Sequence, residues 1–380
     1  MSIRSFACGT LPRASLPLGV LLMLTPFPLR GSAKEPAAPV VLSIGGRAQA
    51  YYSMDERIQW SGVEQTFGAE ARLEAALNQT HPWGRWSAEG EFYLNQPFGK
   101  TLLLDENRIK YKPNFTREPF EISRLALRLQ HGGWTWKAGK METPFGRCRV
   151  PVFFNSKWDA PFIRTEAILW RETGLFAVYR RGPFSLEAGI ANGEEDRDTN
   201  SESARLARIG LEGETWEAGL SVKSQDGISS ERQKRFNGHT GMDFQWRRGR
   251  VSVYGEIIRD EYGFRHPLAD EDIFWERSLY ERDVFFKGDT PVTGVGGYVG
   301  TGIQFDAWSL DLILDAYRPE KIGQPLHDQD VRRALLKGTF RPWASMTAFG
   351  VVLLENHREV RSWQEGRKGL AVALGAAYLF

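Results

Sequence analysis

Apolar and polar residues alternate one by one along most of this chain after residue 40. In residues 63–78, for example, Leu73 and Leu77 share one parity, whereas Glu70 and Arg72 share the other. A period of two is typical of β-strands, because successive side chains of a strand point to opposite faces of the sheet. Helical spacing does not fit these segments. The alternation therefore predicts an all-β fold.

The connections between the alternating segments constrain the fold further, because long and short connections alternate strictly along the chain. An up-and-down antiparallel barrel of sixteen strands needs eight long and seven short connections, and outer-membrane barrels combine short periplasmic turns with longer outer loops. We therefore predict a 16-stranded antiparallel transmembrane β-barrel. Its strands are expected at about residues 42–52, 63–78, 83–94, 120–130, 133–141, 172–181, 183–192, 204–213, 214–223, 239–247, 250–258, 292–306, 307–317, 331–341, 343–354 and 369–380.

Tryptophan positions provide a second test of the barrel. Eight of the 13 tryptophans lie close to a predicted short turn: Trp83, Trp86, Trp134, Trp136, Trp216, Trp246, Trp308 and Trp343. Indole rings gathered at one level of a barrel form an interfacial girdle, since their amphipathic body suits the lipid headgroup region. Tryptophan is also common in strands generally. The predicted strand centres, however, contain almost none, which favours the girdle.

The last predicted strand, GLAVALGAAYLF, places Leu370, Leu374, Tyr378 and Phe380 on one parity. A lipid-facing strand that ends in an aromatic residue resembles the sorting signal of bacterial outer-membrane barrels. We therefore expect the bacterial outer membrane as the location. The mean hydropathy of -0.39 excludes a bundle of transmembrane helices. A barrel accommodates this value, because each strand turns only half of its side chains to lipid.

Residues 1–33 have the pattern of a secretory signal peptide: Arg4 and Arg13, an uncharged apolar stretch, and a Gly-Ser-Ala exit. A membrane anchor is the alternative, but three prolines interrupt a stretch that is already short for spanning. We expect residues 34–41 to form a short lead and residues 42–380 to form the barrel.

Several function classes are disfavoured by composition. The net charge of +2 comes without a basic block, which argues against binding of nucleic acid. Removal of residues 1–33 would leave Cys148 as the single cysteine, so neither a disulfide nor a cysteine metal site or haem-attachment motif is expected. The six histidines are scattered, and HExxH and GxSxG are absent. We expect no cofactor, no metal and no catalytic residue.

Sixteen strands enclose an aqueous lumen, and the inward parity of the predicted strands is rich in charge. Any one of these charges either forms a cross-strand ion pair or acts on the conducted solute, and for a single residue the ion pair is favoured. The candidate pore-wall bases are Arg47, Arg72, Arg85, Arg124, Arg128, Lys137 and Arg208. They are accompanied by Lys223, Arg247, Arg333 and Lys337, and by the acids Glu64, Glu70, Glu74, Glu89, Glu91, Glu187, Glu212, Glu217, Asp243, Asp311 and Asp315.

The third long connection, residues 142–171, is the candidate constriction loop because it is long and rich in proline and aromatic residues. Its candidate constriction residues are Arg147, Arg149, Lys157 and Arg164, opposed between residues 143 and 165 by Asp159 alone. Excess positive charge in a narrow passage favours anions. The arginines equally well pin the loop to an acidic wall, and the sequence leaves both interpretations open. The acidic connections at about 193–203 and 259–291 either bind divalent cations that bridge lipopolysaccharide or are simply solvated.

Four short stretches resemble the phosphate-selective porin O/P family: SIGGRAQAYY at residues 43–52, GKMETPFG at 139–146, RETG at 171–174 and LEAGIANGE at 186–194. The resemblance implies a trimeric, sixteen-stranded outer-membrane channel whose third loop folds inward, with an arginine ladder and a lysine cluster that select phosphate. Here the wall has as many acids as bases, and the loop has one lysine, Lys157. The resemblance thus implies the fold and a channel, and for the solute only a preference for anions.

We conclude from the sequence that the chain is an outer-membrane porin for passive diffusion of small hydrophilic solutes, with a preference for phosphate-like anions. Its expected partners are membrane lipid or lipopolysaccharide, two further copies in a homotrimer, and small anionic or mixed solutes. The alternative is a barrel that sheathes a partner such as a multihaem cytochrome in an electron conduit across the outer membrane. The sheath would need a haem-binding partner, since this chain has no haem-attachment motif.

Overall fold

The computed structural model describes residues 38–55, 64–98, 120–147, 171–192, 203–226, 236–262, 292–321, 329–359 and 367–380. The predicted signal peptide lies outside these residues, and so do residues 34–37 of the predicted lead. The strands are β1 (Val41–Asp55), β2 (Glu64–His81), β3 (Gly84–Phe98), β4 (Phe120–His131), β5 (Trp134–Glu142), β6 (Arg171–Arg181), β7 (Phe184–Ala191), β8 (Ala204–Glu212), β9 (Trp216–Asp226), β10 (Phe236–Arg248), β11 (Val251–Tyr262), β12 (Val292–Gln304), β13 (Trp308–Lys321), β14 (Gln329–Trp343), β15 (Met346–Glu359) and β16 (Arg367–Leu379). No helix long and apolar enough to cross a membrane occurs in this part of the chain.

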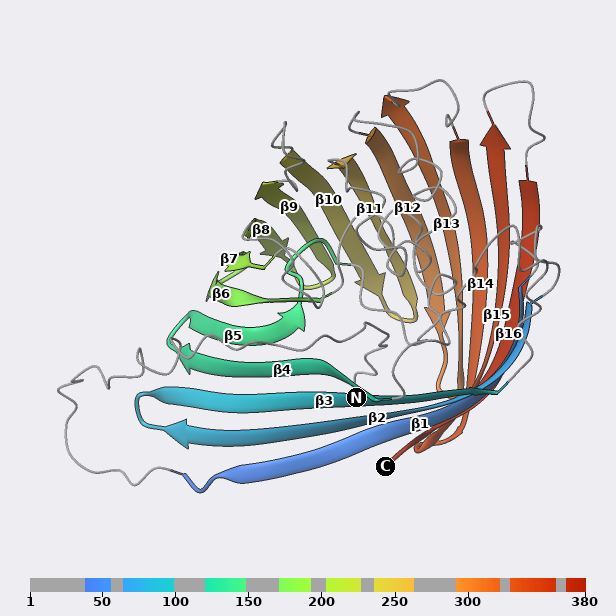
Figure 1. The fold of residues 1–380 in the computed structure, drawn as a ribbon. Coiled ribbons are helices and arrows are strands. Elements are labelled where there is room, and N and C mark those ends of the chain that lie inside the picture. The colour runs from blue at the N-terminus through green and yellow to red at the C-terminus, as the bar shows by residue number, and fades with distance from the viewer. Residues whose placement is uncertain are drawn as a thin grey trace.

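The strands form one closed antiparallel barrel (Figure 1). Each strand pairs with its neighbours in sequence, and β1 pairs with β16 to complete the ring. Closure leaves no sheet edge, so that every strand has a hydrogen-bonding partner on both sides. The predicted 16-stranded antiparallel barrel is confirmed.

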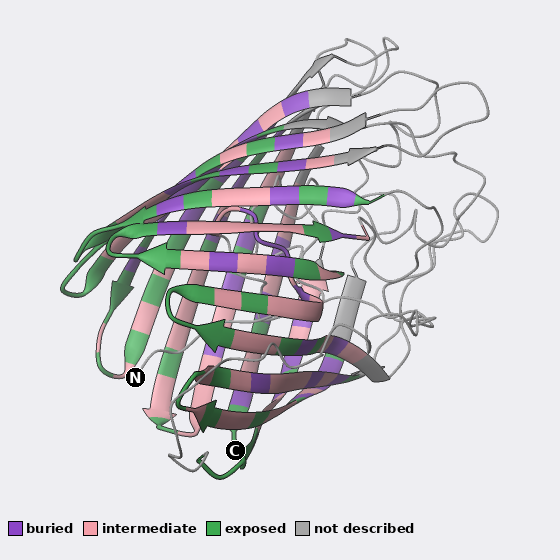
Figure 2. Cartoon of the chain, turned by 90° about the vertical axis from the view of Figure 1, so that its left-hand side faces the viewer, coloured by how far each residue is buried: buried purple, intermediate pink, exposed green. Residues whose placement is uncertain are grey.

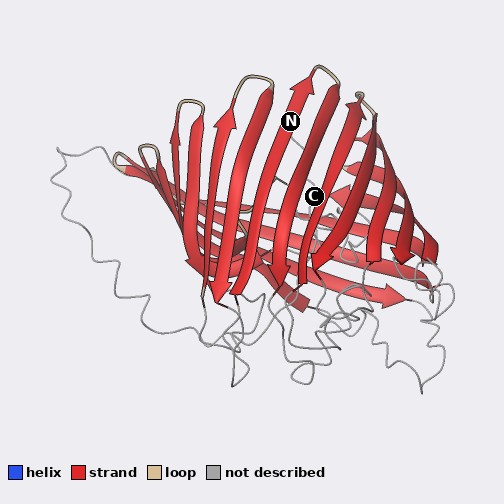
Figure 3. Cartoon of the chain, turned by 90° about the horizontal axis from the view of Figure 1, so that it is seen from above, coloured by secondary structure: helices blue, strands red, loops and turns tan. Residues whose placement is uncertain are grey.

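The short connections all lie at one end of the barrel, where Figure 3 shows them as tan turns. They join β2 to β3, β4 to β5, β6 to β7, β8 to β9, β10 to β11, β12 to β13 and β14 to β15, as expected for up-and-down strands. Gly132, Gly182 and Gly249 have φ values of 55°, 56° and 57° in three of these turns. Positive φ is readily adopted only by glycine, which explains the residue type there.

The outer face of the barrel is apolar, and exposed and less exposed residues alternate along the strands (Figure 2). Tryptophans occur where the strands meet the short turns, and seven of the eight predicted girdle residues are 37–66 % exposed. The eighth, Trp86, donates a hydrogen bond from Nε1 to Gln79 Oε1 at 2.9 Å. The tryptophans thus surround the end of the barrel at which the short turns lie.

The inner face is less uniformly charged than the sequence predicts. One sector, formed by β1 and β12–β16, turns apolar side chains inward, and these side chains are buried. They include Leu335, Val351 and Leu353. Alternation fails to reveal this sector because strands such as β15 carry apolar residues on both parities. Charged side chains interrupt this sector, since Arg333 of β14 lies 3.9 Å from Asp315 of β13 and 3.1 Å from Glu355 of β15.

The seam between β1 and β16 is completed by Phe380, which follows β16. Gly46 and Phe380 exchange two backbone hydrogen bonds, of 3.0 and 3.1 Å. The Phe380 ring lies over Gly46, where an added Cβ would come within 2.4 Å of the ring and 2.8 Å of the Arg72 carbonyl oxygen. Only glycine leaves this space open, so Gly46 allows the ring to cover the seam.

We expect the substitution Gly46→Val to destabilise the barrel by about 1–3 kcal/mol, because the added methyl groups would overpack the seam. Gly45→Ala is the matched control, since its Cβ would meet only the Phe380 carbonyl oxygen at an ordinary 3.7 Å. The measurement is the temperature at which the folded band is lost in heat-dependent gel migration. Equal temperatures for the two variants would contradict this account.

Candidate functional site

After β5 the chain turns into the barrel rather than away from it, as can be followed in Figure 1. We call residues 143–147 the inward segment. The Gly146 N–H donates to Ser221 Oγ of β9 at 2.9 Å, and the Arg147 N–H donates to the Glu256 carboxylate of β11. The Phe145 ring packs against Gly241 of β10, where an added Cβ would lie 2.8 Å from it. The inward segment therefore contacts the inner surfaces of β9, β10 and β11.

The local sequence explains why the chain bends here. Pro144 has no N–H to donate to a strand ladder, and the Phe145 N–H donates back to the Thr143 carbonyl oxygen at 2.8 Å. Gly146 has a φ of 61°, which favours glycine. Thr143 and Pro144 thus end the β5 ladder, and Gly146 redirects the chain toward β11.

A carboxylate of β6 links the start of the inward segment to β9. Glu172 is fully buried and accepts hydrogen bonds from Thr143 Oγ1 at 3.0 Å and from Lys223 Nζ of β9 at 2.7 Å. An inward cluster of apolar residues from β4 to β8 lies on the same side of the barrel: Ala126, Met141, Phe176, Ala191, Ala204 and Leu206. This side of the inner face therefore carries a packed apolar layer.

Arg147 is held by the wall. Its Nη2 donates to Gln245 Oε1 at 2.6 Å, and its Nη1 pairs with the Glu217 carboxylate. Of the two interpretations that the sequence leaves open for the arginines of this connection, these contacts favour pinning for Arg147. The other candidate constriction residues, Arg149, Lys157 and Arg164, lie outside the described residues.

The most concentrated charge cluster surrounds Glu91 of β3, whose side chain is fully buried. Arg171 Nη2 lies 2.9 Å from its carboxylate, Arg124 Nη2 lies 3.5 Å away and Arg72 Nε lies 3.8 Å away. A β-bulge in β4 adds Ser123, whose hydroxyl also contacts the carboxylate. One carboxylate thus lies within 4 Å of three guanidinium groups, and we call these five residues the Glu91 cluster. Arg124 Nε also lies 4.0 Å from the Glu89 carboxylate, which offsets part of the positive charge.

Most of the other candidate pore-wall bases also have acidic partners. Arg128 Nη2 lies 2.9 Å from Glu89, Lys137 Nζ lies 2.6 Å from Glu187, and Arg208 Nη2 lies 2.7 Å from Asp243. Arg85 donates to Asn78 Oδ1 at 2.8 Å. Arg47 lies on the inward parity of β1, two residues before the buried Gln49. For Arg128, Lys137 and Arg208 the ion-pair interpretation describes the wall better than a row of free cations.

Sequence reasoning missed several residues that build this site: Ser123, Arg171, Glu172, Ser221, Gln245 and Glu256. Glu256 had a usable signal, because it shares the inward parity of β11 with Ser252 and Tyr254. Arg171 and Glu172 belong to the RETG stretch that resembles the porin family, but alternation does not say which residue at a strand end turns inward. Among the described residues, no group of His, Cys, Asp or Glu could hold a metal ion.

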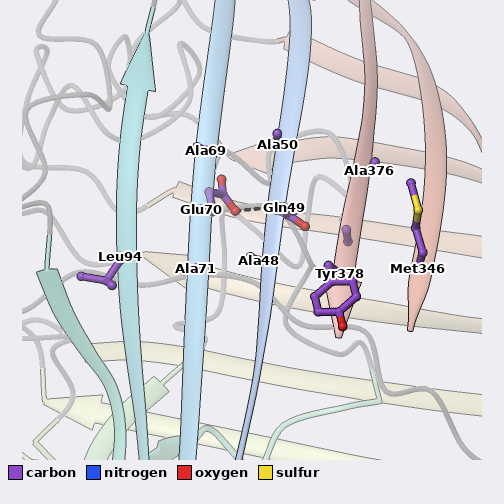
Figure 4. A pocket seen from close by; sticks show the side chains of 11 residues that line it. Ala48, Gln49, Ala50, Ala69, Glu70, Ala71, Leu94, Met346, Ala376 and Tyr378 are labelled. Atoms are coloured by element: carbon purple, nitrogen blue, oxygen red, sulfur yellow. Dashed lines mark hydrogen bonds between the residues drawn. The ribbon is translucent and has the colours of Figure 1, made fainter. Parts of the chain in front are cut away.

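A separate hollow of about 620 Å³ lies on the outer face, across β1–β3, β15 and β16 (Figure 4). Its lining includes the alanines Ala48, Ala50, Ala69, Ala71 and Ala376, with Leu94, Met346 and Tyr378. Gln49 donates to Glu70 at 2.6 Å. Both side chains belong to the inward parity, so the hollow is a feature of the apolar outer surface.

Comparison with known proteins supports the fold. No protein-family model matches the chain, and no curated protein does. Solved structures do match: an anion-selective porin from Comamonas acidovorans has a TM-score of 0.64 and 9 % identity, over 90 % of this chain and 100 % of that one. The outer-membrane channel DcaP of Acinetobacter baumannii has a TM-score of 0.65 and 11 % identity, over 90 % of this chain and 97 % of that one. The trimer form of OmpT from Vibrio cholerae has a TM-score of 0.61 and 11 % identity, over 90 % and 100 %.

At such low identity these likenesses establish a porin-type barrel fold and nothing more specific. The resemblance to the phosphate-selective porin O/P family is supported at the level of the sixteen-stranded barrel, while its phosphate selectivity has no such support.

We expect Glu91→Gln to destabilise the barrel by about 3–5 kcal/mol, because it leaves buried guanidinium groups without their carboxylate. Glu187→Gln should cost about 0–1 kcal/mol, since the Lys137–Glu187 pair is partly exposed. Thermal unfolding of both variants in detergent, followed by circular dichroism, measures the difference. A Glu91→Gln barrel as stable as Glu187→Gln would show that the Glu91 cluster does not stabilise the wall.

Proposed function

We propose that the chain is a porin of the bacterial outer membrane that forms a water-filled channel for passive diffusion of small hydrophilic solutes. The observation that carries the proposal is a closed sixteen-stranded barrel with an apolar outer face and buried charge on its inner wall. Such an inner face suits water, whereas the outer face suits lipid. The inward segment occupies part of the lumen beside β9–β11.

The proposal includes the topology and processing of the chain. The short turns would lie on the periplasmic side, and the exposed tryptophans beside them would sit at that lipid boundary. Residues 1–33 would serve as the signal peptide and residues 34–41 as a lead to the barrel of residues 42–380. Residues 142–171 would form the constriction. Lipid and lipopolysaccharide would surround the barrel.

We further propose a modest preference for anions, including phosphate-like ones. The support is the Glu91 cluster, in which three guanidinium groups lie within 4 Å of one carboxylate, while Glu89 offsets part of the charge of Arg124. Arg149, Lys157 and Arg164 would add positive charge to the constriction. Because most other wall bases have an acidic partner, the net field along the channel is weak, and so is the expected selectivity. The inward segment also disfavours a sheath for a cytochrome, since a threaded partner would need that space.

The channel proposal predicts stable, ohmic conductance when the purified protein is inserted into a planar lipid bilayer. In a KCl gradient the reversal potential should lie on the side of the chloride equilibrium potential, because the guanidinium groups of the Glu91 cluster and the bases proposed for the constriction attract anions. Inorganic phosphate added to one side tests the finer preference. A barrel that inserts but never conducts would overturn the channel proposal, and a reversal potential on the potassium side would overturn the anion preference alone.

A homotrimer is the assembly that we propose. The hollow on the outer face supports it, because small side chains allow a second surface to approach closely. We expect the detergent-purified protein to have the mass of three copies, and Ala71→Trp, which fills the hollow, to release monomers. Leu220→Trp is the control, since Leu220 is exposed on the outer face of β9. Light scattering measures the mass, and a monomeric wild type would refute the trimer.

A further inference from the structure

The inward segment is attached to the wall through its backbone. Within two consecutive residues, the Gly146 N–H donates to β9 and the Arg147 N–H donates to β11. Backbone contacts of this kind do not depend on which side chains the segment carries. The wall residues that accept them therefore decide where the segment lies.

Of these acceptors, Glu256 is the charged one, and it contacts both residues of the pair. It is 2 % exposed, and its carboxylate accepts the Arg147 N–H. The same carboxylate fills the space beside Gly146, where an added Cβ would lie 2.3 Å from Glu256 Oε1. Gly146 also has a φ of 61°. Glycine at position 146 and the carboxylate at position 256 thus fit together as a pair.

The Arg147 side chain is the competing anchor, and it is the weaker one. Its partner Glu217 has a side chain that is 40 % exposed, so water screens the pair. Its second contact, from Nη2 to Gln245 Oε1, is a part-buried hydrogen bond to an uncharged amide. The hydrogen bond from the Arg147 N–H to Glu256 is charge-assisted and buried, and such bonds are about twice as strong as neutral ones. Burial therefore favours Glu256 over Arg147 as the group that holds the segment.

We propose that Glu256 is the positioning residue of the channel: its carboxylate fixes the inward segment across the lumen and so sets the width of the passage beside β9–β11. The solute need not contact Glu256, because the residue acts through Gly146 and Arg147. The single-channel measurement below rests on the proposed channel function. The claim that Glu256 fixes the inward segment rests only on the contacts of that segment.

Two variants test the proposal. Glu256→Ala removes the acceptor, and Glu256→Gln keeps an acceptor oxygen of the same shape without the charge. Arg147→Gln tests the competing anchor. Glu187→Gln is the matched control, because Glu187 is an inner-wall carboxylate of β7 that pairs with Lys137 of β5 and so lies on other strands than β9–β11. Heat-dependent gel migration first shows whether each variant forms a folded barrel.

The first measurement does not depend on conduction. With Cys8 replaced by Ser, Cys148 is the single thiol and directly follows Arg147 in the sequence. We expect Glu256→Ala to speed its labelling by a small methanethiosulfonate about tenfold, as loss of a charged hydrogen bond raises local opening. Glu256→Gln should fall between Glu256→Ala and the wild type. Arg147→Gln should change the rate about twofold, and Glu187→Gln should leave it unchanged.

The second measurement is single-channel current. The Glu256→Ala channel should show a higher and more variable conductance than the wild type, whereas the Glu187→Gln channel should not. The proposal would be overturned if Cys148 in the Glu256→Ala variant were labelled at the wild-type rate. It would also be overturned if Arg147→Gln raised the labelling rate more than Glu256→Ala does. If the wild type does not conduct, the channel proposal fails, and thiol labelling alone still decides whether Glu256 positions the segment.

Discussion

Backbone hydrogen bonding is the constraint on which the rest of this structure depends. A sheet in contact with lipid has no water to satisfy an open edge, so its strands must close into a ring. The pairing of β1 with β16, completed by Phe380 over Gly46, meets that requirement. Once the ring is closed, the period of two assigns every side chain to the outside or to the lumen. The apolar outer face and the charged inner wall are both consequences of this geometry.

Closure also determines how charge is arranged inside. Buried carboxylates such as Glu91, Glu172 and Glu256 are costly to desolvate, and each is offset by donors from other strands or from the inward segment. These contacts stiffen the wall and narrow the lumen at the same time. The same residues therefore connect the stability of the barrel to the passage that we propose for solutes.

Much of the fold could be predicted from the sequence, because the signals for it are local. Alternation in segments such as residues 63–78 predicts strands, and the alternation of long and short connections predicts their antiparallel order. The positions of Trp134 and Trp216 predict the level of the short turns. The apolar inner sector around Leu335 and Leu353 was missed, since both parities of its strands are apolar and local pattern does not distinguish them.

The sequence by itself determined that this chain forms a closed sixteen-stranded barrel, and it identified most bases of the inner wall. Only the tertiary structure decided which acids those bases meet and where the inward segment lies. Arg171 meets Glu91, which is 80 positions away in sequence, and the Arg147 N–H meets Glu256, which is 109 positions away. A period of two fixes the face of a residue. It does not fix the partner across the lumen, because that depends on the register and curvature of all the strands between them.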